Sequence, residues 1–239
     1  MKKILFVAAA LAFATPASAV TVDPYDQLTG PTPAVGSFVF GTVNPGTGVI
    51  TPFNSLQRPC DGNAPVTCFR NAGDPFGIPS AVASTVAFPS GTVNVPNDRI
   101  FLHPSNGAFA GVSFVAALSG TYNFAGEFSM QDVNPSGVEI GAIILNGAPV
   151  LTSSLLFAGS RTFNFDALLN AGQSVSFFVG PAGNSNNDST GLFLRVTGLA
   201  PVVGAVPEPS TWLMMILGFG LVGGTLRSRR RAATGLAAA

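Results

Sequence analysis

Short runs in which apolar and polar residues alternate recur along the chain from about residue 81, and a period of two is typical of half-buried β-strands. Phe and β-branched residues fill most of the apolar positions, and both kinds of side chain favour strands. Turn residues separate the runs. We expect strands over Ser84–Phe88, Ile100–Leu102, Phe109–Leu118, Thr121–Met130, Val138–Leu145, Ala148–Leu151, Arg161–Phe165, Ser174–Gly180 and Gly191–Thr197.

Turn signals set the order of these strands. Asn146-Gly147 stands between two apolar runs, and this dipeptide is the strongest short signal for a β-hairpin. Residues 20–80 are richer in Gly, Pro, Asn and Thr, so only short pieces such as Ser37–Phe40 are expected as strands there, and Asn44–Gly48 disfavours helix. The patterns predict an all-β, antiparallel sandwich of about eight to ten strands, with Phe supplying most core aromatics.

The first residues have the composition of a secretory signal peptide. A basic Met1–Lys3 precedes an apolar Ile4–Phe13, and Ala17-Ser18-Ala19 is a small-x-small cleavage site. We expect residues 1–19 to be removed after Ala19, with Ala17 and Ala19 as the recognised residues. The mature chain then begins at Val20 and is exported through the secretory pathway.

The other end of the chain carries a second targeting pattern. Pro207-Glu208-Pro209 is followed by fifteen uncharged residues, Trp212 to Leu226, and then by a cluster of four arginines. Trp at one border and Arg at the other anchor a membrane span, and the Arg end favours the cytoplasm. We therefore expect a single transmembrane helix over 212–226. The arginines are Arg227, Arg229, Arg230 and Arg231.

This order of parts resembles the PEP-CTERM sorting signal of exported bacterial proteins. The match consists of Pro207, Glu208, Pro209, Trp212, the Gly-rich apolar run and the Arg cluster. The resemblance implies that exosortase, a membrane protease, cleaves near the Pro-Glu-Pro block and passes the protein from the inner membrane to the cell surface or extracellular matrix. Leu213 stands where Ala commonly follows the Trp, and the tail at 232–239 extends beyond the usual end.

A plain C-terminal membrane anchor is the alternative. Fifteen residues at ~1.5 Å rise cover roughly 22 Å, which is short of a ~30 Å hydrocarbon core. The glycines of this run lower helix stability further. A short, Gly-rich span suits a protease signal better than a permanent anchor. The expected organisation is a signal peptide at 1–19, a sandwich ectodomain at 20–198, a linker at 199–206, the sorting signal at 207–231, with its basic cluster at 227–231, and a tail at 232–239.

The charge of the ectodomain differs from that of the complete chain. The complete chain is formally neutral, but its lysines and four of its arginines lie in the two targeting ends. The remaining part holds five Arg against ten Asp and Glu, so it is net acidic. Clustered cations are needed to bind nucleic acid or anionic lipid, and none remain. We therefore expect no nucleic-acid partner.

Two cysteines, Cys60 and Cys68, enclose a polar, turn-rich heptapeptide. Export places them in an oxidising compartment, so we expect a disulfide rather than free thiols. A metal site is disfavoured because no His or further Cys stands nearby.

Several pieces between residues 120 and 198 add a second resemblance. They are similar to the jelly-roll half of many exosortase-sorted proteins and of sandwiches like carbohydrate-binding modules, which implies a jelly-roll-like fold and leaves the ligand open. The pieces are Gly120–Tyr122, Phe128 with Asp132, Asn146-Gly147, Ala171–Gly180 and Asn187–Leu192.

Residues suited to catalysis are few. His103 is the only histidine and has the setting of a surface or structural residue, and no Gly-x-Ser-x-Gly nucleophile motif occurs. Glu127, Asp132 and Glu139 are near enough in sequence to be imagined as a pair of glycosidase carboxylates, but ordinary surface charge is the better interpretation. We expect no enzyme, no catalytic residue, no cofactor and no metal site.

One loop leaves a question open. Residues 183–190 are rich in side-chain oxygens around Asp188 and could coordinate Ca²⁺, with Asp132 or Asp166 as distant help. The same loop is typical of a turn whose Asn and Asp side chains cap their own backbone, and this is the favoured interpretation.

The leading functional hypothesis is a non-enzymatic surface or matrix protein associated with exopolysaccharide or biofilm. The alternatives are a secreted glycan-binding or glycan-hydrolysing protein and a simple membrane-anchored periplasmic domain. Trp212 lies in the predicted span, and the ectodomain has only two tyrosines, so aromatic platforms for sugars are scarce and the structural role is favoured.

Overall fold

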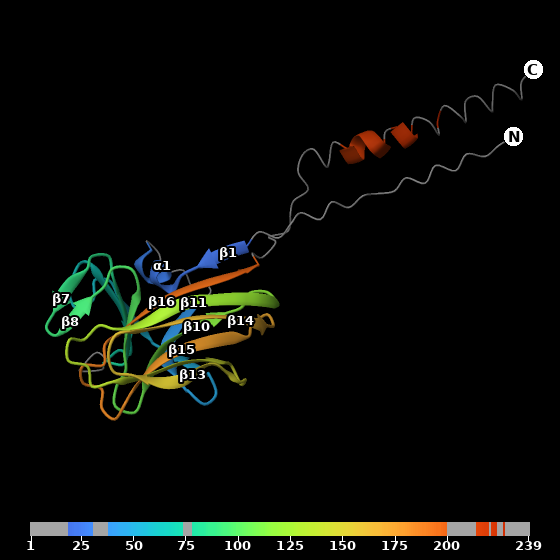
Figure 1. The fold of residues 1–239 in the computed structure, drawn as a ribbon. Coiled ribbons are helices and arrows are strands. Elements are labelled where there is room, and N and C mark those ends of the chain that lie inside the picture. Colours follow the sequence, from blue (N-terminus) through green and yellow to red (C-terminus); the bar gives the residue numbers. More distant parts are fainter. Residues whose placement is uncertain are drawn as a thin grey trace, which may run out of the picture. The chain divides into compact units, whose positions relative to one another are not determined.

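A computed structural model describes residues 19–30, 38–73, 78–199, 214–219, 221–223 and 227 of the chain. The chain divides after Ala200 into two compact units. The first unit is a two-layer sandwich in which every paired strand is antiparallel (Figure 1). The predicted all-β antiparallel sandwich is therefore confirmed.

The larger layer is an eight-stranded sheet in the order β14-β11-β16-β9-β6-β5-β4, with β1 paired to β16 beside this path. Its strands are β1 (Ala19–Val22), β4 (Ser55–Gln57), β5 (Val66–Arg70), β6 (Ser80–Ser84), β9 (Ile100–His103), β11 (Gly120–Met130), β14 (Ser160–Leu169) and β16 (Thr190–Leu199). The long β11 is the centre of the layer, because it pairs with β14 on one side and with β16 on the other.

The second layer is a six-stranded sheet in the order β13-β12-β15-β10-β2-β3. Its strands are β2 (Phe38–Val43), β3 (Ile50–Pro52), β10 (Phe109–Val115), β12 (Val138–Ile144), β13 (Pro149–Leu156) and β15 (Ser174–Pro181). The predicted hairpin at Asn146-Gly147 joins β12 to β13, and Asn146 has the positive φ of 53° that such a turn favours. A separate hairpin pairs β7 (Phe88–Ser90) with β8 (Val93–Val95).

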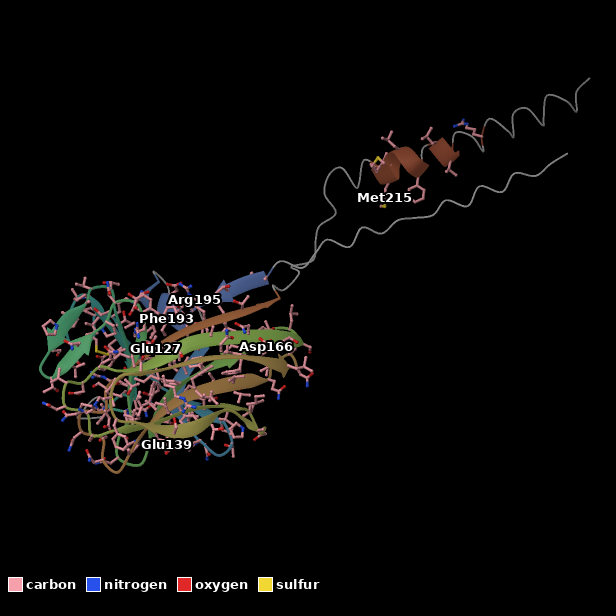
Figure 2. All side chains as sticks on the ribbon, in the orientation of Figure 1. Glu127, Glu139, Asp166, Phe193, Arg195 and Met215 are labelled. Carbon is pink, nitrogen blue, oxygen red and sulfur yellow. A yellow bond between two sulfur atoms is a disulfide. The ribbon has the colours of Figure 1, made fainter. Side chains whose placement is uncertain are left out.

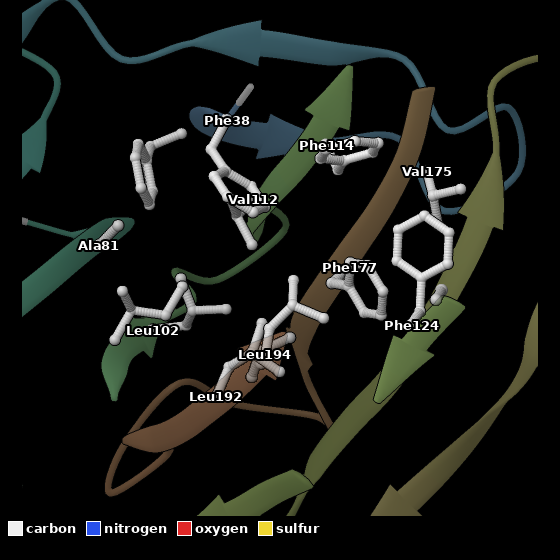
Figure 3. Close-up of a cluster of buried hydrophobic side chains, with 14 of the residues drawn as sticks. Phe38, Ala81, Leu102, Val112, Phe114, Phe124, Val175, Phe177, Leu192 and Leu194 are labelled. Atoms are coloured by element: carbon white, nitrogen blue, oxygen red, sulfur yellow. The ribbon is translucent and has the colours of Figure 1, made fainter. Parts of the chain in front are cut away.

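The core lies between the two layers and is built largely from aromatic rings, as expected (Figure 3). Phe177 of the six-stranded sheet meets Phe124 and Phe163 of the eight-stranded sheet, at ring-centroid distances of 5.8 and 5.4 Å. Each such pair contributes about 0.5–1.5 kcal/mol beyond the burial of its surface. Because successive side chains of a strand point to opposite faces of the sheet, these rings point into the core and the residues between them point outward.

Two expectations about the strands were wrong. Ser84–Phe88 is not a strand: β6 ends at Ser84, whose hydroxyl donates to the carbonyl of Val86 in a turn before β7. The described residues also contain sixteen strands rather than the expected eight to ten. Four of the additional strands, β3, β4, β7 and β8, have only three residues each. Strands this short cannot show an alternating pattern, and they form because a neighbouring strand offers a partner.

A short helix, α1 (Pro24–Thr29), follows β1 and was not expected. Asp23 caps its N-terminus by accepting a 2.8 Å hydrogen bond from the Tyr25 amide, and Pro24 occupies the first turn, where the missing N–H is not needed. Leu28 is buried against the sandwich core. The helix therefore covers part of the core near the start of the mature chain.

The second unit, Pro201–Ala239, is described only at 214–219, 221–223 and 227, and these residues are helical. Their apolar side chains are exposed in this chain, among them Met215 (Figure 2). Among the residues that the structure describes, no helix is long and apolar enough to cross a membrane.

Candidate functional site

The outward face of the eight-stranded sheet carries a group of polar side chains around one aromatic ring. The strand register places Phe193 opposite Glu127, and Arg195 opposite Ala125. The Arg195 guanidinium lies over the Phe193 ring, 5.1 Å from its centroid (Figure 2). This cation–π contact holds an aromatic ring at the surface between a cation and a carboxylate. We call this face the polar platform; it consists of Asn123, Glu127, Asn164, Asp166, Phe193 and Arg195.

Hydrogen bonds fix the polar groups of the platform at one end. The Asn123 amide donates to the Asn164 side-chain oxygen and to a carboxylate oxygen of Asp166, both at 2.8 Å. The register sets these residues side by side, because Asn123 pairs with Asp166 and Ala125 with Asn164. Side chains held in this way lose less rotamer freedom when a ligand binds.

Ion pairs border the platform at its other end. Arg99 donates to Glu127 at 2.9 Å and to the Ser129 hydroxyl at 2.8 Å, and it pairs with Asp98 at 2.8 Å. The hydrogen bond from Arg99 lowers the pKa of Asp98, and the same bond is the first cause that raises the pKa of Arg99. Arg99 therefore holds the Glu127 side chain in place on the strand opposite Phe193.

A groove of about 510 Å³ lies beside the turn between β2 and β3, away from the platform. Its lining includes hydroxyl and amide side chains and one aromatic ring, from Thr42, Asn44, Thr47, Thr51 and Phe109. Asn44 is occupied in the turn, because its side-chain oxygen accepts from the amides of Gly46 and Thr47. This amide group therefore serves the turn rather than the groove.

Two of the acids singled out in the sequence come together at one end of the eight-stranded sheet. Asp188 is fully buried and Asp132 is 8% exposed. The amide of Gln131 donates to the carbonyl of Ser189 at 2.9 Å, which brings the segment after β11 against the segment before β16. Asp166 is not part of this group, since it lies on the platform. Of the two acids considered as additional ligands, Asp132 therefore lies near the oxygen-rich loop at 183–190 and Asp166 does not.

Burial is the first cause that raises the pKa of Asp188 above its usual range, and the negative charge of Asp132 acts in the same direction. A hydrogen bond from the Ser136 hydroxyl and the charge of His103 oppose this shift. His103, the only histidine, ends β9, and its Nδ1 donates to the Pro104 carbonyl at 2.7 Å. It therefore has the structural setting that the sequence suggested.

The three acids that could be imagined as glycosidase carboxylates are not brought together. Glu127 lies on the outward face of the eight-stranded sheet, whereas Glu139 lies on β12 of the opposite layer (Figure 2). Asp132 is buried at the end of β11. These positions do not form a pair of facing carboxylates.

Cys60 and Cys68 form the predicted disulfide. Within the loop that it closes, Asp61 and Gly62 have positive φ values of 46° and 79°, and Asp61 accepts hydrogen bonds from Arg70. Both cysteines are buried beside Val66. The bridge therefore fixes the loop that leads into β5.

Most residues of the two predicted targeting signals lie outside the described part of the chain. These are Ala17, Pro207, Glu208, Pro209, Trp212, Arg229, Arg230 and Arg231. Ala19 is the first residue of β1 and is the partner of Leu199 at the end of β16. Arg227 is described as helical. The chain thus enters and leaves the sandwich at the same end of the same pair of strands.

The fold and these positions define a small β-sandwich in which the start of β1 lies beside the end of β16. Residues 205–231 match the family profile of the PEP-CTERM protein-sorting motif. The chain therefore carries this sorting motif, as the Pro-Glu-Pro block and the Arg cluster indicated, and the motif marks it as an exported protein. No curated protein matches the sequence.

Distantly similar sandwiches occur among solved structures. One is a family 35 carbohydrate-binding module from Clostridium thermocellum, with 15% identity, 59% of this chain and 95% of that chain covered, and a TM-score of 0.32. Another is the CBM35 from Cellvibrio japonicus Abf62, with 12% identity, 77% and 95% covered, and a TM-score of 0.32. At TM-scores this low, the similarity carries nothing about the ligand of this chain.

Proposed function

We propose that this protein is delivered through exosortase as a non-enzymatic component of the cell surface or extracellular matrix. The signal peptide takes the chain across the inner membrane, and the C-terminal segment holds it there until the protease acts. The observation that carries the proposal is the PEP-CTERM motif at residues 205–231. We propose matrix polysaccharide as the binding partner of the released sandwich.

The position of the two chain ends favours this route. The mature chain would begin at Val20, in the strand that pairs with the last residues before the sorting segment. Both predicted membrane segments would then leave from one end of the sandwich. A folded sandwich could remain intact while its C-terminal segment is cut, because its described core residues all lie before residue 200. The disulfide fits an oxidising compartment outside the cytoplasm.

Intact-mass analysis of the protein from its own host, with and without the exosortase, tests this route. We expect a mass that starts at Val20 and lacks the residues beyond the Pro-Glu-Pro block, only when the protease is present. Added mass at the new C-terminus would show to what the protein is joined. An Arg-rich tail retained in both strains would instead make the protein a membrane-anchored periplasmic domain.

We further propose that the polar platform is the surface through which the sandwich associates with matrix polysaccharide. Phe193 offers one ring face, and Arg195, Glu127, Asn123 and Asp166 supply donors and acceptors around it. Sites for polar ligands combine apolar contact with a few positioned polar groups in this way. A flat sheet face suits a long chain rather than a small molecule.

Affinity electrophoresis of the protein in gels that contain host exopolysaccharide tests this surface. We expect retardation of the wild type and loss of retardation in Phe193→Ala. Phe157→Ala is the matched control, because Phe157 is also a surface phenylalanine, 57% exposed, on a segment outside the platform. Equal retardation of both variants would show that the polar platform does not bind the polysaccharide. The appearance of new reducing ends in the polysaccharide would instead favour the hydrolase alternative.

A further inference from the structure

The buried acids Asp132 and Asp188 lie at the end of the sandwich opposite to that where β1 and β16 meet the targeting segments. Met130 pairs with Thr190, and the bond from the Gln131 amide to the Ser189 carbonyl extends this register by one residue. Asp132 and Asp188 are the chain neighbours of this hydrogen-bonded pair, and both side chains are buried. Asp132 itself forms an isolated antiparallel bridge with Val93 of β8.

Each of these carboxylates has an oxygen without a hydrogen-bond partner. Among the described residues, no donor reaches Oδ1 of Asp132 or Oδ2 of Asp188, although both atoms are buried. A buried charged oxygen without a hydrogen-bond partner is strongly unfavourable unless a proton or a cation neutralises it. Two such groups face the same region here, and their negative charges oppose each other.

Neutral oxygens surround the same place. The Ser136 hydroxyl oxygen lies 2.7 Å from Oδ1 of Asp188 and 3.5 Å from the side-chain oxygen of Asn184, and it also contacts the carbonyl oxygen of Asn186. One hydroxyl carries one proton and can donate to only one of these three acceptors. Acceptor oxygens therefore outnumber donors. Asn184 and Asn186 are exposed, so the group of oxygens reaches solvent.

We propose that this cluster is a Ca²⁺ site, in which Asp132 and Asp188 supply the charge and Ser136, Asn184 and the carbonyl of Asn186 supply neutral oxygens. Ca²⁺ takes six to eight oxygen ligands in flexible geometry, and water would complete the shell. Two carboxylates balance the charge of one divalent cation. All of these donors are hard oxygens, which suit Ca²⁺. A group of three or more His, Cys, Asp or Glu side chains does not occur among the residues that the structure describes.

A proton shared by the two acids is the competing explanation. Both explanations neutralise the buried charge, but only the cation makes stability depend on Ca²⁺ and requires oxygens beyond the two carboxylates. The excess of acceptors around Ser136 favours the cation, because its one proton serves only one of three oxygens, and of these only the Asn184 side-chain oxygen has a further donor within the described residues, the Asn186 amide at 2.9 Å.

Calorimetric titration of the full chain, purified in mild detergent and freed of metal with a chelator, tests the site with CaCl₂ as the probe. We expect a dissociation constant on the order of 10⁻⁴–10⁻³ M, the range of extracellular Ca²⁺ modules. Asp132→Asn and Asp188→Asn keep the size of each side chain and remove its charge, so each should weaken binding about tenfold or more. Asp166→Asn is the matched control on the platform and should bind as the wild type does.

Thermal unfolding without Ca²⁺ separates a lost ligand from a damaged fold. We expect Asp132→Asn and Asp188→Asn to unfold at or above the wild-type temperature in the chelator, since each removes a buried like charge. Ca²⁺ should then raise the unfolding temperature of the wild type and of Asp166→Asn only. The proposal would be overturned if 10 mM Ca²⁺ left the wild type unchanged, if both Asn variants kept the full response, or if Mg²⁺ acted equally well.

Discussion

Ala19 and Leu199 are Cα partners in the ladder between β1 and β16. The first of these residues precedes the predicted cleavage site of the signal peptide, and the second ends the last strand before the C-terminal unit. Three further pairs continue the ladder to Val22 and Val196, and the hydroxyls of Thr21 and Thr197 lie 2.9 Å apart. The predicted cleavage after Ala19 would thus leave an N-terminus that lies in a paired strand rather than in a free tail.

Removal of this strand should destabilise the sandwich. We expect a mature chain that begins at Asp23 to lose about 2 kcal/mol of unfolding free energy relative to one that begins at Val20, because several ladder hydrogen bonds are lost. Urea denaturation measures the difference. Val20→Ala, which changes a side chain that is 44% exposed, should be nearly neutral and serves as the control. Equal midpoints for the two chain starts would show that β1 contributes nothing.

The Arg cluster should control the orientation and sorting of the C-terminal segment. Changing Arg227, Arg229, Arg230 and Arg231 together to Gln removes the positive charge that keeps this end in the cytoplasm. We expect much less protein at the cell surface, measured by accessibility of whole cells to an antibody against the sandwich. The same four positions changed to Lys should retain display. Unchanged display of the Gln variant would count against the sorting role of the cluster.

Much of the fold could be predicted because its long strands carry their own pattern. β11 alternates aromatic with small or polar residues over most of its length, so its two faces and its aromatic core positions are evident from the sequence. The three-residue strands such as β3 and β4 carry no such pattern, and only their pairing partners define them. Helix α1 could have been found, since Asp23 before Pro24 is a common helix start.

The candidate sites were predictable to a smaller degree. Phe193 and Arg195 are two residues apart in an alternating strand, which places them on one face, but their neighbours Glu127 and Asn123 come from β11 and depend on the register. The oxygen-rich loop around Asp188 was evident from its composition. Its connection with Asp132 and Ser136 spans more than fifty residues of sequence and arises only from the sheet topology.

The disulfide should make a moderate contribution to stability. It closes a short loop, for which the restriction of the unfolded chain corresponds to about 2–3 kcal/mol. We expect Cys60→Ala combined with Cys68→Ala to lower the unfolding free energy by roughly this amount in urea titrations, and reduction of the wild type to have a similar effect. A thiol at Cys68 that reacts in the native, secreted protein would contradict the bridge.

Asp23 should make the sandwich less stable as the pH rises from about 4 to 6. Burial is the first cause that raises its pKa, to about 6, against the hydrogen bond from the Tyr25 amide. At Asp23 the folded state therefore binds more protons than the unfolded state between these values, so the contribution of this group to stability is greatest below pH 4 and is lost as the pH rises through about 6. The side chain is only partly buried, so the change should be about 1–2 kcal/mol rather than the full value of the shift.

Asp23→Asn isolates this effect, because Asn caps a helix as well as Asp does but has no proton to release. We expect the wild type to lose stability relative to this variant as the pH rises from 4 to 6, and the difference to be constant above pH 7. Urea denaturation of both proteins at each pH measures the difference directly. A difference that stays the same across the whole range would mean that the Asp23 carboxyl group titrates alike in the folded and unfolded chains.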